Sequence, residues 1–354
     1  MALITTPGLA LIAPLAPPTW HKEADYLLNG VAPVLAADFA RERYVIEGVR
    51  CRAKDIISRA GVAKRVIGPS GGLELVPANT LSYTYSGGRR RLYAEGAATN
   101  LYRNDQIVKD SGTDYTVTAQ PYTLSFLGGG RLNIGSAGPS ADVYGVGRTV
   151  RTTYTFTPTA GTLWISPTWE GSQSIEAVQL EAGYYATSYI PTTTAAVTRV
   201  TDVMTFSAAV TALLSAAGPC TLVLRGTITR PGTALYSILT STSRVLSLHG
   251  TGAFLVEMGG ASITAPVGVE TGAELEMGAA LSWGPAGRAI SVNGSAVASN
   301  AALATSAMGS LWLGASTGLP AGGRYELDQL LIYPGYDAGT ALRGAARVWN
   351  GAEL

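Results

Sequence analysis

The residues of this chain best suited to chemistry are aromatic rings and planar polar groups, the side chains that bind sugars. A ring can stack on the apolar face of a sugar while polar groups hydrogen-bond to its hydroxyls. The candidates are Trp164, Trp169, Tyr184 and Tyr185 in residues 105–191, and Tyr236, Arg244, His249, Glu257, Trp283 and Trp312 in residues 192–354. Trp169 is the best of them, because turn residues surround it in "SPTWEGS". Packing in a core is the commoner role of any single ring, so the list is a set of hypotheses.

A pair of carboxylates raises the alternative of glycoside hydrolysis. Glu274 and Glu276 in "ELEMGAALSW" lie two residues apart and therefore on one face of a strand. Retaining hydrolysis needs two carboxyl groups about 5–5.5 Å apart, one of them kept protonated. The strand lacks the denser acidic pattern of concanavalin-like glycosidases, because Leu275 separates the pair and Met277 follows it. With only two histidines in the chain, serine-triad chemistry is also poorly supplied. We therefore expect a protein that is not an enzyme.

Neither a metal nor a cofactor is expected. Cys51 and Cys220 are the only cysteines, they lie far apart, and no His/Cys cluster accompanies them. They are expected to be free, mostly buried thiols in different domains. The glycine-rich stretches "LSFLGGGRLNIG" and "GPSGG" do not open a helix with a phosphate-binding lysine, so they predict hairpin turns.

The charge balance excludes recruitment of nucleic acid by a global field. The formal net charge is +1, and only 14% of the residues are charged. A locally basic stretch from Arg41 to Arg65 is diluted by acidic residues and has few aromatic ones. It predicts either contact with an acidic partner protein or a solvated face.

Alternating and turn-bounded patterns predict an all-β protein. Strict alternation in "DYTVTA" and "TTYTFTP" places aromatic and aliphatic side chains on one face of a strand and threonines on the other. We expect short strands and a connector in residues 36–104, a first β-sandwich in 105–191 and a second in 192–354. Asn293-Gly294 predicts a type I′ hairpin turn. The last stretch, residues 338–351, predicts a helix with Leu342, Ala346 and Trp349 on one side.

Five segments of the chain resemble parts of tailed-phage fibre and receptor-binding proteins. "RRRLYAEGAATNLYRND" is similar to the segment that precedes a carbohydrate-binding-module-like jelly roll in such proteins. "VQLEAGYYATSYIPTTTAAVTRVTD" resembles the signature that closes this jelly roll. "SVNGSAVA", "LWLG" and "YELDQLLIYPG" resemble the concanavalin-A-like lectin sandwich found at the end of the same proteins. The resemblance covers about residues 36–354.

The resemblance implies a virion component that binds host surface polysaccharide, capsule or lipopolysaccharide, for attachment. It would be a head spike or tail fibre of a bacteriophage or of a phage-like gene transfer agent, and a homo-oligomer, with a trimer our guess. A purely structural spike or fibre is the alternative, and a capsule depolymerase is a third. Within the closing signature, Gln179 and Glu181 share one strand face, Leu180 the other, and Arg199 and Asp202 are expected to pair. We interpret this signature as domain closure more than ligand contact.

The first 35 residues are expected to form an extended attachment arm. Their apolar run is broken by prolines and lacks a basic start, which argues against a secretion signal, a helix and membrane insertion. Exposed leucine and isoleucine in such an arm would need cover from another virion protein, such as capsid, spike base or baseplate. The protein would then be made in the bacterial cytoplasm and carried on the particle surface.

Overall fold

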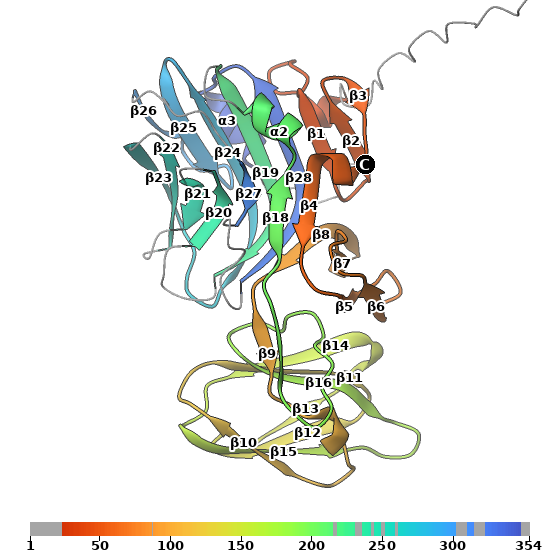
Figure 1. The fold of residues 1–354 in the computed structure, drawn as a ribbon. Coiled ribbons are helices and arrows are strands. Elements are labelled where there is room, and N and C mark those ends of the chain that lie inside the picture. The colour runs from red at the N-terminus through yellow and green to blue at the C-terminus, as the bar shows by residue number, and fades with distance from the viewer. Residues whose placement is uncertain are drawn as a thin grey trace, which may run out of the picture.

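The structure is a computed structural model that describes residues 23–86, 88–214, 218–230, 236–241, 244–248, 252–258, 261–301, 310–314 and 323–347. It is an all-β structure made of several antiparallel sheets, with short helices at their margins. Two bodies stand out in Figure 1, a large unit above and a small unit below. The short helical elements are η2 (Ala24–Tyr26), α1 (Ala53–Ile56), η3 (Asn104–Gln106), α2 (Ala208–Leu213) and α3 (Thr340–Ala345).

The large unit is built on a ten-stranded sheet whose main path runs β26-β25-β24-β19-β28-β1-β2-β3, with β8 on β28 and β7 on β8. On the edge of β28 opposite β19, two strands pair in succession: β1 with the C-terminal half of β28 and β8 with its N-terminal half. The strands are β1 (Leu35–Asp38), β2 (Arg43–Ile46), β3 (Val49–Arg50), β7 (Tyr83–Ser86), β8 (Arg89–Glu95), β19 (Cys220–Thr229), β24 (Glu274–Gly284), β25 (Gly287–Val292), β26 (Ala298–Asn300) and β28 (Arg324–Pro334).

A seven-stranded sheet covers one face of the ten-stranded sheet, in the order β23-β22-β21-β20-β27-β18-β4. Its strands are β4 (Ile57–Ala60), β18 (Val203–Phe206), β20 (Tyr236–Thr240), β21 (Arg244–Leu248), β22 (Ala253–Met258), β23 (Ala261–Gly268) and β27 (Trp312–Leu313). Side chains of both sheets form one hydrophobic core, in which Leu222 and Leu281 of the larger sheet meet Ile238 and Phe254 of the smaller. Burial of these branched and aromatic side chains stabilises the large unit.

The small unit has two sheets around a core of its own. The four-stranded sheet has the order β10-β15-β12-β13, and the three-stranded sheet the order β14-β11-β16. The strands are β10 (Thr113–Val117), β11 (Tyr122–Gly128), β12 (Arg131–Ser136), β13 (Ala141–Tyr144), β14 (Gly147–Phe156), β15 (Gly161–Thr168) and β16 (Ile175–Ala182). The core lies between the two sheets and includes Leu124, Phe126, Leu163, Ile165 and Leu180.

The small unit is an insertion between two strands of the large unit. The chain leaves after β8 through β9 (Ala98–Asn100) and returns through β17 (Val197–Arg199), and these two strands pair antiparallel with each other. Figure 1 shows both crossing segments side by side between the bodies. The hairpin of β5 (Lys64–Ile67) and β6 (Leu73–Val76) lies at the same level.

The strands of residues 36–104 are therefore not a separate region, as the sequence suggested. β1, β2, β3, β7 and β8 extend the ten-stranded sheet, and β4 pairs with β18 of the seven-stranded sheet. Cys51 and Cys220 are free thiols as expected, but both contact the core of the large unit. Cys220 is buried, and burial raises the pKa of its thiol to about 12. The expectation of two different domains for these cysteines was wrong.

Part of the predicted attachment arm belongs to the fold. Residues 1–22 lie outside the described residues, whereas Tyr26 and Leu28 pack on the outer face of the ten-stranded sheet beside Leu342 of α3. The Tyr26 hydroxyl donates to Asp38 over 2.6 Å, and the Tyr333 hydroxyl donates to the Tyr26 carbonyl over 2.8 Å. The prediction of an extended arm over all of residues 1–35 was therefore wrong for the part around Tyr26 and Leu28.

Two local predictions hold and one does not. Asn293 and Gly294 both have positive φ, 51° and 71°, as a type I′ turn requires. Leu342 and Ala346 are buried on one side of α3, while Trp349 lies outside the described residues. Gly128–Gly130 is not a hairpin turn but carries the chain from β11 in one sheet to β12 in the other.

Candidate functional site

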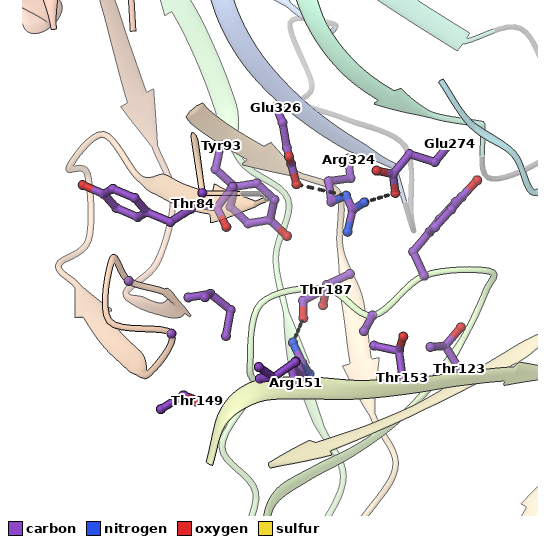
Figure 2. Close-up of a pocket in the computed structure, with 18 of the residues that line it drawn as sticks. Thr84, Tyr93, Thr123, Thr149, Arg151, Thr153, Thr187, Glu274, Arg324 and Glu326 are labelled. Carbon is purple, nitrogen blue, oxygen red and sulfur yellow. Dashed lines mark hydrogen bonds and ion pairs between the residues drawn. The ribbon is translucent and has the colours of Figure 1, made fainter. Parts of the chain in front are cut away.

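A cleft of about 830 Å³ lies between the large and the small unit. Its floor is the outer face of the three-stranded sheet, and its roof is the lower end of the ten-stranded sheet (Figure 2). Residues from both units line it together with the β5–β6 turn, so the site exists only in the assembled chain. Volumes of this order are typical of ligand sites in proteins.

Threonine hydroxyls cover the floor. Thr123 of β11 and Thr153 and Thr155 of β14 line the cleft, and the hydroxyls of Thr123 and Thr155 lie 2.9 Å apart. The period of two in a strand explains this face, because Tyr154 and Phe156, between and after the threonines, pack on the core. The alternation seen in the sequence is confirmed, and its polar side faces the cleft.

Arg151 adds a fixed positive charge to the floor. Its Nη2 donates to the Ser125 hydroxyl over 2.8 Å, and its Nη1 donates to the Thr187 carbonyl. Burial lowers the pKa of Arg151, with Glu181 acting in the opposite direction. An arginine keeps its charge under such a shift, so the floor presents a cation beside the hydroxyls.

Tyr184 and Tyr185 form an aromatic wall after the turn at Gly183. Their ring centroids lie 6.4 Å apart, and their planes are tilted by 53°. Tyr184 rests on Gly272 of the large unit, where an added Cβ would lie 2.6 Å from the ring. Tyr185 lies near Arg324, whose guanidinium carbon is 5.7 Å from the ring centroid. Burial raises the pKa of Tyr185 to about 12, so its hydroxyl is neutral.

An arginine and two carboxylates form the roof. Arg324 of β28 is paired with Glu274 of β24 and also lies 3.6 Å from Glu326 (Figure 2). Glu326 also forms an ion pair with Arg91 at 3.0 Å. Glu274 is the most accessible of these groups, with 43% of its side chain exposed. The roof therefore offers planar donors and acceptors with balanced charge.

The two carboxylates that suggested hydrolysis are not a catalytic pair in this structure. Glu274 lines the cleft, but Glu276 is outside its lining and is bound by Arg89 at 2.8 Å and Arg91 at 2.9 Å. A general acid needs a carboxyl kept protonated by an apolar pocket. Neither glutamate lies in an apolar pocket, because both are partly exposed and paired with arginines.

The turn of the β5–β6 hairpin closes one end of the cleft. An added Cβ at Gly71 would lie 2.1 Å from the carbonyl oxygen of Thr149, so only glycine fits this contact with β14. The turn sequence, Gly-Pro-Ser-Gly-Gly over residues 68–72, matches the Gly-x-Ser-x-Gly pattern of a nucleophile elbow. It joins two strands of a hairpin, whereas an elbow joins a strand to a helix. The hairpin turn predicted for "GPSGG" is confirmed.

Of the residues nominated for sugar binding whose side chains the structure describes, only Tyr184 and Tyr185 line the cleft. Trp164 lies on the outer face of the four-stranded sheet, and Trp169 packs partly on the core of the small unit. Trp312 and Glu257 are half-buried in the seven-stranded sheet. The side chains of Tyr236 and Arg244 and the whole of His249 lie outside what the structure describes.

Trp283 is a core residue. Its side chain is 1% exposed and packs within the core of the large unit, so its ring has no free face for a ligand. The nomination of Trp283 is therefore corrected. The cleft residues that the sequence did not nominate, chiefly Thr153, Arg151 and Arg324, come from strands far apart in the chain.

A buried network ties the closing signature to the preceding segment. Asn100 of β9 donates from its amide to the carbonyls of Val178 and Ile190, at 3.1 and 3.0 Å. Its Oδ1 accepts from the backbone amides of Leu180 and Tyr102, each at 3.0 Å. The side chain is fully buried. One asparagine thus joins the entry strand to the last strand of the small unit and to the exit segment.

Charged groups meet beside this network, at the junction of the two units. Lys64 of β5 lies between Glu95 of β8, at 3.1 Å, and Asp202, at 2.6 Å. Arg199 pairs with Glu95 at 3.1 Å, and Arg59 of β4 pairs with Asp202 at 2.6 Å. Their side chains are at most 4% exposed. We call these five residues the junction cluster.

Arg199 and Asp202 therefore do not pair with each other as the sequence suggested; each binds other members of the junction cluster. Glu95 also accepts from the Ser188 backbone amide at 2.8 Å and from the Tyr93 hydroxyl at 2.8 Å. Gln179 and Glu181 share a strand face and bind the backbone of Ile190 and Thr187. These contacts fit the interpretation of the signature as domain closure.

The described part of the chain has no group of three His, Cys, Asp or Glu side chains placed to hold a metal ion. Within the same residues, no helix has the length and apolar character needed to cross a membrane.

No protein-family model matches the sequence, and no curated protein matches it. Among solved structures, the chain is similar to the Trypanosoma rangeli sialidase in complex with sialic acid, with 12% identity and a TM-score of 0.31. The match covers 40% of this chain and 25% of the sialidase chain. It is a distant likeness between β-rich folds and says nothing of what this chain binds.

Proposed function

We propose that this chain is an attachment protein on the surface of a bacteriophage or a phage-like gene transfer particle, where it binds host surface polysaccharide in the cleft between its two units. The observation that carries the proposal is the lining of the cleft. Threonine hydroxyls, two tyrosine rings and an arginine–carboxylate pair face one cavity of about 830 Å³. Hydroxyls and planar charged groups hydrogen-bond to sugar hydroxyls, and the rings cover apolar sugar faces.

The particle part of the proposal rests on the sequence segments that resemble phage fibre proteins, chiefly the two that flank the small unit. Both segments meet at the junction of the units, where Asn100 and Glu95 belong to the first and Ser188 and Arg199 to the second. In this proposal the small unit is a carbohydrate-binding-module-like jelly roll, and the large unit is a concanavalin-A-like sandwich. Their strand content and separate cores are consistent with that assignment.

The partners follow from the same proposal. The first 22 residues attach the protein to capsid, spike base or baseplate, and the chain assembles as a homo-oligomer, for which a trimer is our guess. It recognises capsule or lipopolysaccharide and neither binds nucleic acid nor inserts into a membrane. The net charge of +1 supports the exclusion of nucleic acid.

Removing one aromatic ring or one floor hydroxyl is expected to weaken polysaccharide binding. Tyr185→Ala should weaken it by roughly tenfold, because a stacked ring contributes on the order of 1 kcal/mol beyond its buried area. Thr153→Val keeps the shape of the floor and removes one hydroxyl, so a smaller loss is expected. Binding to capsule and lipopolysaccharide preparations on a biosensor surface measures both.

Thr205→Val is the matched control, since Thr205 lies in β18, outside the cleft lining. It should bind like the unchanged protein. If neither cleft variant alters binding while all variants remain folded, the cleft is not the binding site. If the unchanged protein binds no host polysaccharide, a structural spike becomes the better account.

Glu274→Gln separates binding from depolymerisation. We expect no reducing ends from capsule incubated with the unchanged protein or with this variant, because Glu274 is paired with Arg324 and the other carboxylate of the roof, Glu326, is also paired with arginines. Binding by the variant should fall by less than tenfold, as for a partly exposed ion pair. A reducing-end assay run beside the binding assay measures both. Sugar release by the unchanged protein that disappears in Glu274→Gln would make the chain a depolymerase.

A further inference from the structure

The four-stranded sheet of the small unit has an outer face that points away from the cleft. The small unit has one core between its two sheets, and the cleft uses the outer face of the three-stranded one. In Figure 1, β10 and β15 lie at the bottom, on the side furthest from the large unit. This second face is independent of the cleft in position and in residues.

Trp164 lies flat on this face. Its neighbours in β15, Leu163 and Ile165, are fully buried in the core, so the indole points outward. An added Cβ at Gly112 would lie 1.8 Å from its Nε1, and one at Gly135 would lie 3.4 Å from its Cε3. The ring thus takes the space that side chains at these two glycines would fill. The residue is half-buried, so part of its surface remains accessible to a ligand.

A row of fixed polar groups runs beside the tryptophan. Trp164 is in register with Gly135 and Asp114, and the next row of the same face holds Asp142, Asn133 and Ser166. Residues two apart in a strand are roughly 7 Å apart, about the length of one sugar unit. Asp142 accepts from Arg131 at 2.6 Å and from Asn133 at 2.7 Å, so its position is fixed.

A third row extends the surface further from the tryptophan. Arg131 stands opposite Tyr144, a residue that is 65% exposed. The face therefore offers one flat ring, a fixed polar row and a second ring along a path of about 14 Å. That is enough for two or three sugar units.

We propose that this face is a second binding site, for a neutral oligosaccharide. The indole of Trp164 stacks on the apolar face of one sugar, and the Arg131–Asp142–Asn133 group hydrogen-bonds to hydroxyls of the next. Neutral sugars fit best, because the four strands of this sheet carry two carboxylates, Asp114 and Asp142, and one cation, Arg131. A second protein copy fits less well, since the cores of protein interfaces are depleted in charged residues.

Electrophoresis through native gels containing a dissolved polysaccharide tests the site. The probes are dextran, yeast mannan and galactomannan, with polygalacturonate as the acidic polymer. We expect at least one neutral polymer to retard the protein, and Trp164→Ala to weaken that retardation by roughly tenfold or more. Arg131→Ala should weaken it several-fold. Tyr336→Ala, which removes a half-buried ring of the large unit, is the matched control and should behave like the unchanged protein.

The outcomes separate this site from the cleft. If Trp164→Ala is no longer retarded by a neutral polymer while Tyr185→Ala is retarded normally, the second site is supported. The cleft then has no support as the site for that polymer. If Tyr185→Ala is no longer retarded while Trp164→Ala is retarded like the unchanged protein, the second site is overturned and the cleft is supported as the binding site. No retardation by any neutral polymer also overturns the second site. The second site is also overturned if sedimentation shows that the protein self-associates and that Trp164→Ala breaks this association. The face would then be an interface between copies of the chain.

Discussion

Replacing Glu95 by alanine is expected to destabilise the protein by about 3–5 kcal/mol, as removal of one partner from a buried ion pair typically does. Glu95 is the carboxylate to which both Lys64 and Arg199 are paired, at 3.1 Å each, and all three are nearly inaccessible to solvent. Without it, two buried cations lose a counter-ion and the Ser188 amide loses its acceptor. Urea unfolding at pH 7 followed by tryptophan fluorescence measures the change.

The same carboxylate governs the response to acid. Burial alone would raise the pKa of Glu95, but Arg199, Lys64 and the bonds from Ser188 lower it well below its usual value. A group whose pKa is lowered in the folded state stabilises the fold above its unfolded pKa, here about 4.5, and loses that contribution as the pH falls further. The difference in unfolding free energy between the unchanged protein and Glu95→Ala should therefore shrink as the pH falls below about 4.5.

Glu170→Ala is the control for this prediction. Glu170 is an exposed carboxylate of the small unit, so its removal should change stability by no more than about 0.5 kcal/mol. Glu95→Ala behaving like Glu170→Ala, at neutral and at acid pH, would show that the junction cluster does not hold the units together. Glu95→Gln, which keeps the shape and removes the charge, then reports the part of the loss due to charge alone.

Asn100→Asp is expected to disrupt the attachment of the small unit, with a loss of about 3 kcal/mol or more. The amide group of Asn100 donates to two carbonyls, and an aspartate oxygen in its place would face both as an acceptor. Asn100→Ala should lose somewhat less, because it removes four hydrogen bonds but adds no repulsion, and the Val178 carbonyl still accepts from the Asn104 amide at 3.2 Å. Thermal unfolding measures the loss, and limited proteolysis of residues 183–196 reports release of the exit segment.

Asn133→Ala is the matched substitution for this series. Asn133 is partly exposed and donates one bond, to Asp142, so its loss should be small. Equal effects of Asn100→Ala and Asn133→Ala would contradict the role given to Asn100. Normal proteolytic resistance of Asn100→Asp in residues 183–196 would contradict it as well.

The parts of the fold that depend on local chemistry could be predicted from the sequence. The threonine alternation of β14, the turn at Asn293-Gly294 and the buried side of α3 each follow from a short pattern. The tyrosines after Gly183 were also found, because a turn after a strand exposes at least one ring.

The parts that depend on distant pairing could not. The chain pairs β1 and β8 with β28, a strand more than two hundred residues later, and no local pattern reports that partner. Trp283 was misjudged for the same reason: its ring is buried by a sheet whose strands come from several parts of the chain. Arg151 and Arg324 line one cleft only once the insertion has folded against the large unit.

Entry and exit of the small unit are adjacent, since β9 and β17 run side by side over Ala98–Asn100 and Val197–Arg199. Any compact module whose ends come equally close would fit the same attachment without altering the order of the ten strands. Recombination could therefore exchange the small unit as one continuous cassette. Such an exchange would replace the threonine floor and the tyrosine wall of the cleft, while the roof and the rest of the large unit stay the same.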